Sequence, residues 1–148
     1  MKQTTGIFAC LLAILLLATG CAAVRTGRKA NASAIVATEL ARTTRSWDGA
    51  ELPDYPRGRP EVTIRRITVP AGARLEIHRH PVINAGMLLR GELTVVTVDG
   101  KRLHLRAGDP IVELVGTPHY GINEGQAPAE IVVVYAGAVG TPITTPGQ

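Results

Sequence analysis

Short runs of aliphatic and β-branched residues recur from residue 61 to residue 139, and each run ends close to a glycine or proline. Short apolar runs between turn residues are typical of β-strands. The same region shows no helical periodicity of useful length, so the pattern predicts an all-β domain. The predicted strands are Val62–Val69, Arg74–His80, Asn84–Leu89, Leu93–Val98, Arg102–Leu105, Ile111–Val115, His119–Asn123 and Glu130–Ala136.

Two of these runs carry more specific predictions. Asp99-Gly100 separates two strands and is a strong signal for a two-residue hairpin turn. Glu130–Ala136 is almost wholly apolar, which predicts a strand buried on both faces. Eight or nine short antiparallel strands in about 100 residues favour a β-barrel or jelly roll.

The segments on either side of the strands have a different composition. Residues 34–60 are predicted to form an irregular arm, in which the β-branched residues of Ile35–Leu40 favour an edge strand over a short helix. Trp47 and Tyr55 are expected to pin this arm onto the core, and lining a ligand pocket is the alternative. Residues 140–148, rich in Pro, Thr and Gly, are predicted to be a flexible tail.

The chain begins with a targeting pattern. An apolar run at Ile7–Ala18 is too short for a transmembrane helix, which needs about 20 apolar residues, and it fits a secretory signal. The sequence ending at Cys21 resembles the lipobox of bacterial lipoproteins, although Ala18 stands where Leu is usual. The resemblance implies a signal peptide at residues 1–20, diacylglycerol on Cys21 and a tether at residues 21–33.

Two other interpretations of this segment remain open: an ordinary signal peptide cut after a site such as Ala22-Ala23, and an uncleaved anchor. In the lipoprotein interpretation, Cys21 attaches the protein to a membrane of the cell envelope. Ala22 is not the Asp that retains lipoproteins in the inner membrane. We therefore expect the outer membrane, facing the periplasm, in a cell that has one.

Length and charge narrow the classes of function. A chain of 148 residues that is 45% hydrophobic suits one domain with a core of its own. The net charge of +4 is mild and the arginines are scattered, so the sequence gives no support to nucleic-acid binding. The two cysteines are Cys10, in the apolar run, and Cys21. With the first removed and the second acylated, neither a disulfide nor thiol catalysis is expected.

The histidines provide the candidate chemistry. His78 and His80 are separated by one residue, and a β-strand repeats every two residues, so both imidazoles project from one face. Two adjacent imidazoles suit a divalent metal, and His119, which starts a strand after a turn, is the candidate third ligand. His104 shares its face with arginines and is expected to be solvated. The alternative for any one histidine is that it satisfies backbone groups.

Two gapped motifs in this region resemble the two conserved motifs of the cupin family: Gly72-x5-His78-x-His80-x3-Asn84-x6-Gly91 and Gly108-Asp109-x4-Leu114-x-Gly116-x2-His119-x3-Asn123. The resemblance covers residues 61–139, and it implies a small single-domain cupin with one jelly-roll β-barrel. It also implies a divalent transition metal (Fe, Mn, Ni, Cu or Zn) at the barrel mouth, held by His78, His80 and His119.

The motifs depart from the family pattern at two positions. Asn84 stands where cupins place a glutamate ligand, so the resemblance implies three histidines alone or three histidines with the weaker amide oxygen of Asn84. Leu114 replaces a proline in a packing position. Glu76 lies on the same strand face as His78 and is a second candidate for the missing carboxylate, although an ion pair with Arg74 is the simpler expectation. Tyr120 is expected to point away from the site.

Three functions fit this pattern. The first is a metal-dependent dioxygenase or lyase acting on a small organic substrate, with the metal as Lewis acid. The second is a non-catalytic lipoprotein that binds a small ligand, and the third is a structural envelope protein with relic histidines. The resemblance also implies a homodimer. Protonation of the histidines below about pH 6 is expected to release the metal.

Overall fold

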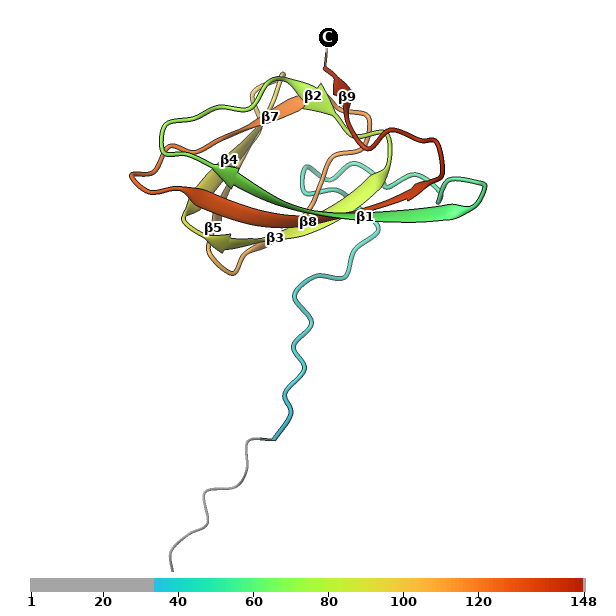
Figure 1. Ribbon diagram of the computed structural model, residues 1–148, viewed down its shortest axis with the longest axis horizontal. Helices are drawn as coiled ribbons and strands as arrows, with labels where there is room; N and C mark the ends of the chain where they lie inside the picture. The colour runs from blue at the N-terminus through green and yellow to red at the C-terminus, as the bar shows by residue number, and fades with distance from the viewer. Residues whose placement is uncertain (1–33, 148) are drawn as a thin grey trace, which may run out of the picture. The chain divides into compact units, whose positions relative to one another are not determined.

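The computed structural model describes residues 34–147, and every regular element within them is a β-strand (Figure 1). The expected signal peptide, lipidation site Cys21 and tether lie outside these residues. Residues 37–147 belong to one compact unit. Within the described part of the chain, no helix is long and apolar enough to cross a membrane.

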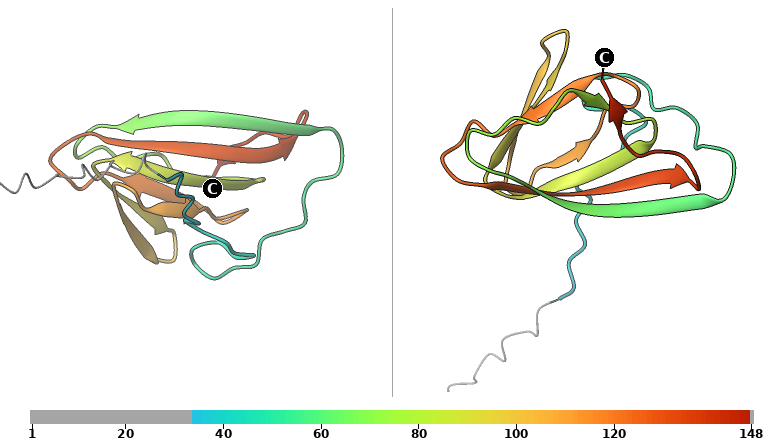
Figure 2. Two further views of the ribbon diagram at one scale, coloured as in Figure 1. Left: turned by 90° about the horizontal axis from the view of Figure 1, so that it is seen from below. Right: turned by 45° about the horizontal axis from the view of Figure 1, so that its top comes forward.

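The strands form two antiparallel sheets that face each other (Figure 2). The first sheet has the order β1-β8-β3-β6, with β1 at Pro60–Val69, β8 at Ala129–Ala138, β3 at Ile83–Arg90 and β6 at Pro110–Val112. The second has the order β5-β4-β7-β2-β9, with β5 at Arg102–Arg106, β4 at Glu92–Thr97, β7 at His119–Ile122, β2 at His78–Arg79 and β9 at Thr145–Pro146.

The inward faces of both sheets supply one hydrophobic core. Its buried members include Leu88 and Val133 from the first sheet and Val95 and Leu105 from the second. Burying one such side chain contributes about 1.5–3 kcal/mol. Gly86 faces the core where the sheet leaves no room, because a Cβ there would lie 2.6 Å from the carbonyl oxygen of Val132. The predicted all-β jelly roll is therefore confirmed.

The hairpin predicted at Asp99-Gly100 is present, but its loop has three residues, Val98 to Gly100, rather than two. Gly100 has a φ of 90°, a conformation in the left-handed region that glycine adopts without a steric penalty. The Thr97 amide donates to the carbonyl of Lys101 at 3.0 Å, which closes the turn between β4 and β5. The Thr97 hydroxyl also donates to the carboxylate of Asp99.

Several strand predictions need correction. Strand β6 ends at Val112, whereas the predicted strand was Ile111–Val115. Only His78–Arg79 of the predicted strand Arg74–His80 is regular, because Arg74 makes just an isolated bridge. Strand β8 is buried on one face alone, and Val134 on its outer face is 38% exposed. Antiparallel sheets often leave one face open to solvent. Ile35–Leu40 has no regular structure and is exposed, since no strand pairs with it.

The arm and the tail both contact the barrel. The amide of Trp47 donates to the Val112 carbonyl of β6 at 2.9 Å, and its ring packs against the core, which confirms that Trp47 pins the arm. Tyr55, in contrast, is 76% exposed. The tail was expected to be flexible, but its Thr145 pairs with Arg79 as strand β9. This pairing extends the second sheet beside the histidines.

Candidate metal centre

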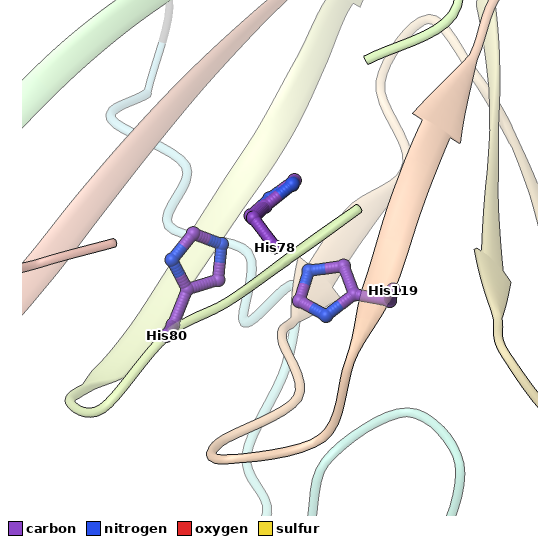
Figure 3. A group of neighbouring side chains, drawn as sticks. All are labelled: His78, His80 and His119. Carbon is purple, nitrogen blue, oxygen red and sulfur yellow. The ribbon is translucent and has the colours of Figure 1, made fainter. Parts of the chain in front are cut away.

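Three histidines from different parts of the chain lie together inside the barrel (Figure 3). His78 in β2 pairs with His119 in β7, and His80 follows at a bridge to Val115. The ring centroids are 4.9 Å apart for His78 and His80, 4.7 Å for His78 and His119, and 5.1 Å for His80 and His119. One ring nitrogen from each histidine lies within 4.8 Å of the other two. The structure therefore brings the three predicted ligands together.

Each histidine is oriented by a backbone carbonyl. The Nδ1 atom of His78 donates to the carbonyl of Glu76, that of His80 to Ile143 and that of His119 to Thr117, each at 2.8 Å. A carbonyl oxygen can only accept, so each Nδ1 carries the hydrogen and each Nε2 has a free lone pair. This pattern is typical of metal-ligating histidines, whose second nitrogen is held by a hydrogen bond.

Two buried polar atoms of the site, His119 Nε2 and Glu113 Oε2, have no hydrogen-bond partner among the described residues. They lie 3.6 Å apart. Buried polar atoms in folded proteins are almost always satisfied, so this pair calls for a missing partner. Each atom has a free lone pair, and a cation satisfies such a pair. The Oδ1 atom of Asn84 is also buried without a partner among residues 34–147.

Burial keeps His80 and His119 neutral. Desolvation lowers the pKa of His80 to about 4, helped by the charges of His119 and His78 and opposed by the hydrogen bond to Ile143. Desolvation also lowers the pKa of His119. The neutral imidazole is the form that binds a metal. Desolvation raises the pKa of Glu113 to about 7, and the Leu114 amide and the charge of His78 oppose this rise.

The site lies between an inner and an outer cavity. The inner cavity, of about 40 Å³, is bordered by His119 and Glu113, and the outer one, of about 490 Å³, is bordered by Arg65 and Thr144. Both are lined by His78, His80 and Tyr135. The outer volume suits a small-molecule site, and the inner one suits little more than an ion or a water. Together with the free ring nitrogens, the inner cavity fits a divalent transition metal.

The other candidate residues have different outcomes. Asn84 is buried and inward-facing, but its amide nitrogen donates to the nearby Val82 carbonyl at 3.3 Å. Glu76 is exposed and contributes its carbonyl to the site. The expected ion pair between Arg74 and Glu76 is not formed within residues 34–147, because Arg74 stacks over Tyr120 at 3.8 Å from the ring centroid. The expectation assumed that side chains alternate between the two faces of a strand. That alternation does not hold here, because residues 74–77 do not form a regular strand.

His104 lies outside the site, as expected. It is exposed on the second sheet, where its ring nitrogens lie 3.1 Å from the Thr94 hydroxyl and 3.4 Å from a carboxylate oxygen of Glu92. Tyr120 alternates with the buried His119 along β7 and faces away from the core, which agrees with the prediction.

Glu113 and Tyr135 were not among the site residues predicted from the sequence. Burial raises the pKa of Tyr135, the charge of Glu113 raises it further and the charge of Arg65 opposes the rise, so this phenol lies within electrostatic reach of both. The signal for Glu113 was a single acidic residue in the apolar run Ile111–Val115. Alternation along that run places Glu113 on the same face as the buried Ile111.

Comparisons with known proteins agree with the fold. The family model described as "Cupin domain" matches residues 65–135. None of the proteins with curated functions matches the sequence. Among solved structures, an oxalate oxidase in complex with glycolate is 27% identical and covers 57% of this chain and 45% of its own, with a TM-score of 0.48.

Two further structures are similar. The DMSP lyase DddQ from Ruegeria pomeroyi is 22% identical and covers 57% of this chain and 42% of its own, with a TM-score of 0.51. A conserved Klebsiella pneumoniae protein with a double-stranded β-helix domain is 20% identical and covers 63% of this chain and 88% of its own, with a TM-score of 0.50. The match thus spans less than half of the oxidase and lyase chains. The last two likenesses show a shared fold, and the cupin domain model matches residues 65–135, a little under half of the chain.

Proposed function

We propose that this protein is a metal-dependent cupin that binds one divalent transition metal through His78, His80 and His119 and acts on a small organic substrate. One observation carries the proposal. Each of the three Nδ1 atoms donates to a backbone carbonyl, which leaves a free lone pair on each Nε2 atom. One ring nitrogen from each histidine lies within 4.8 Å of the other two. Three separate hydrogen bonds that all orient one constellation indicate a built ligand set.

The outer cavity is the proposed substrate site. Its walls combine apolar side chains, including Leu75 and Ile77, with the guanidinium of Arg65 and the phenol of Tyr135. Because its pKa is raised, the Tyr135 hydroxyl keeps its proton at neutral pH and can donate a hydrogen bond. The cation of Arg65 favours a substrate with an acidic group. A bound metal supplies Lewis acidity to the oxygen it contacts.

We propose dioxygenase or lyase chemistry for this site. The fold itself does not decide between reactions, because one barrel supports many functions. The position of His78 and His80 in the walls of both cavities supports contact between substrate and metal. A non-catalytic protein with the same metal and the same cavity is the alternative.

The metal content of the full chain tests this proposal. We expect protein purified from cells, without an affinity tag or added metal, to contain close to one equivalent by mass spectrometry. A His78→Ala/His119→Ala variant is expected to contain none. A redox-active metal directs the search to oxygen consumption, and zinc directs it to lyase products. Wild-type protein that is empty and takes up no added metal would refute the proposal.

We also propose that the protein is anchored to the cell envelope through Cys21. The apolar run Ile7–Ala18 and the residues that follow it up to Cys21 support this proposal. Metabolic labelling with a fatty-acid analogue tests it, and we expect label in wild-type protein and none in a Cys21→Ser variant. Equal labelling, or none in either protein, contradicts the proposal.

A further inference from the structure

The first cupin motif of this chain lacks its acidic residue, and the structure supplies one from the neighbouring strand. We propose that Glu113 is the anionic metal ligand of this site, in place of the glutamate that is missing at Asn84. The proposal rests on the metal site proposed above and adds a fourth ligand to it.

The strand register places Glu113 directly across from Asn84. Strands β3 and β6 pair Gly86 with Ile111 and Ala85 with Val112. The next step of this ladder is a hydrogen bond from the Glu113 amide to the Asn84 carbonyl at 3.0 Å. Both side chains are buried and face the same interior. A carboxylate at either position therefore enters the barrel at the same level.

The main chain of Glu113 is held on both sides. Its amide donates to Asn84, and its carbonyl accepts a hydrogen bond from the Ser46 hydroxyl of the arm at 2.8 Å. The amide of the next arm residue, Trp47, bonds to Val112. These contacts fix the backbone that carries the carboxylate, as a ligand position requires.

The carboxylate faces His119 in a way that calls for a cation. Glu113 Oε2 and His119 Nε2 are 3.6 Å apart, and neither has a hydrogen-bond partner among residues 34–147. The Nδ1 hydrogen of His119 is donated to Thr117, so a lone pair on Nε2 faces the carboxylate oxygen. Two ligands about 2.1 Å from one tetrahedral ion lie about 3.4 Å apart. One metal ion between them satisfies both atoms.

A carboxylate ligand at residue 113 also explains why residue 84 is an asparagine. A glutamate there would place a second buried carboxylate across the ladder from Glu113, and two like charges in a buried site are costly. Asn84 is neutral, so it is compatible with the charge of Glu113. Residues 84 and 113 together therefore carry one carboxylate. It lies on the residue that follows β6 and not on β3.

Cobalt(II) binding to the full chain tests the inference. Affinity is measured by competition with a chromophoric chelator, and the ligand shell by visible and X-ray absorption. We expect wild-type protein to bind one Co²⁺. The isosteric Glu113→Gln variant is expected to bind it ten to a hundred times more weakly, with a changed visible spectrum and one fewer carboxylate oxygen in the first shell. The Asn84→Glu/Glu113→Gln double variant is expected to recover most of the affinity.

Glu92→Gln is the matched control, because Glu92 also lies beside a histidine, at 3.4 Å from His104, but outside the barrel. It is expected to bind Co²⁺ like wild type. If Glu113→Gln has wild-type affinity, or weaker affinity with an unchanged cobalt spectrum, Glu113 is not a ligand and the inference fails. If wild-type protein itself binds no Co²⁺, the metal site fails. Circular dichroism of each variant shows whether it is folded.

Discussion

His80 and His119 illustrate how burial sets the chemistry of single residues. The sequence showed their spacing but not their surroundings, so release of metal was expected below about pH 6, close to the ordinary imidazole pKa. Desolvation lowers the pKa of His80 to about 4 and also lowers that of His119. Protons therefore compete for these two rings only in more acidic solution, and metal retained at pH 5 is compatible with the site.

The protonation of His80 in metal-free protein is the first prediction at this scale. We expect its ring to stay neutral at pH 5 and to titrate near pH 4, because burial disfavours the charged form. Nitrogen chemical shifts of the imidazole, followed by NMR across this range, provide the measurement. A midpoint near the ordinary value of about 6.5 would show that the ring is solvated.

The stability of metal-free protein is the second prediction. The unfolded chain protonates His80 at about pH 6.5, and the native one only at about 4, so acidification through this window lowers the free energy of unfolding by about 3 kcal/mol. Glu113 acts with the opposite sign. Its native pKa is raised from 4.5 to about 7, so its contribution is complete below pH 4.5 and lost as pH rises through 7.

The Glu113→Gln variant loses the contribution of Glu113 to the free energy of unfolding and keeps that of His80. The free energy of unfolding of this variant is expected to fall more steeply than that of wild type between pH 7 and pH 4. Urea unfolding of both metal-free proteins at several pH values measures the difference. Parallel curves for the two proteins would mean that Glu113 has an ordinary pKa.

At the scale of elements, the site depends on two short strands that local sequence could not define. Strand β2 has two residues, and β9 has two more in a segment expected to be loose. The carbonyl that orients His80 belongs to Ile143, and the Thr144 hydroxyl lies 3.3 Å from the same Nδ1. These residues are far apart in sequence, so their contacts depend on the tertiary structure. Local sequence patterns could not predict them.

Removal of this segment is the third prediction. A chain ending at residue 142 lacks Ile143, Thr144 and strand β9. We expect it to bind Co²⁺ ten to a hundred times more weakly than wild type, because loss of a hydrogen bond that orients a ligand has this effect on metal sites. Chelator competition provides the measurement. Deletion of Gln148 alone is the control, and equal affinities of the two shortened chains contradict the prediction.

At the scale of the whole molecule, alternation and turns predicted most strands, and the two motifs predicted the barrel and the three histidines. Glu113 was not predicted, because alternation puts it on the same face as Ile111 but does not show from sequence alone which face of that run is turned inward. Strand β8 was predicted to be buried on both faces because its composition is almost wholly apolar. Composition alone does not show that the outer face of the first sheet is open to solvent.

The shared core gives the fourth prediction. Leu88 is fully buried between the two sheets, so Leu88→Ala leaves a cavity and is expected to lower the free energy of unfolding by about 2–5 kcal/mol. Val134→Ala, on the outer face at 38% exposure, is expected to have a smaller effect. Chemical denaturation of both variants measures the two changes. Equal losses would mean that the outer face of β8 is covered in solution.

The position of a bound metal tests the central claim most directly. Crystals of the protein loaded with Co²⁺, measured on both sides of the cobalt absorption edge, locate the ion by anomalous scattering. We expect one peak in the inner cavity, within bonding distance of the Nε2 atoms of His78, His80 and His119 and of a carboxylate oxygen of Glu113. A peak bound elsewhere, or no peak at these histidines, would contradict the claim.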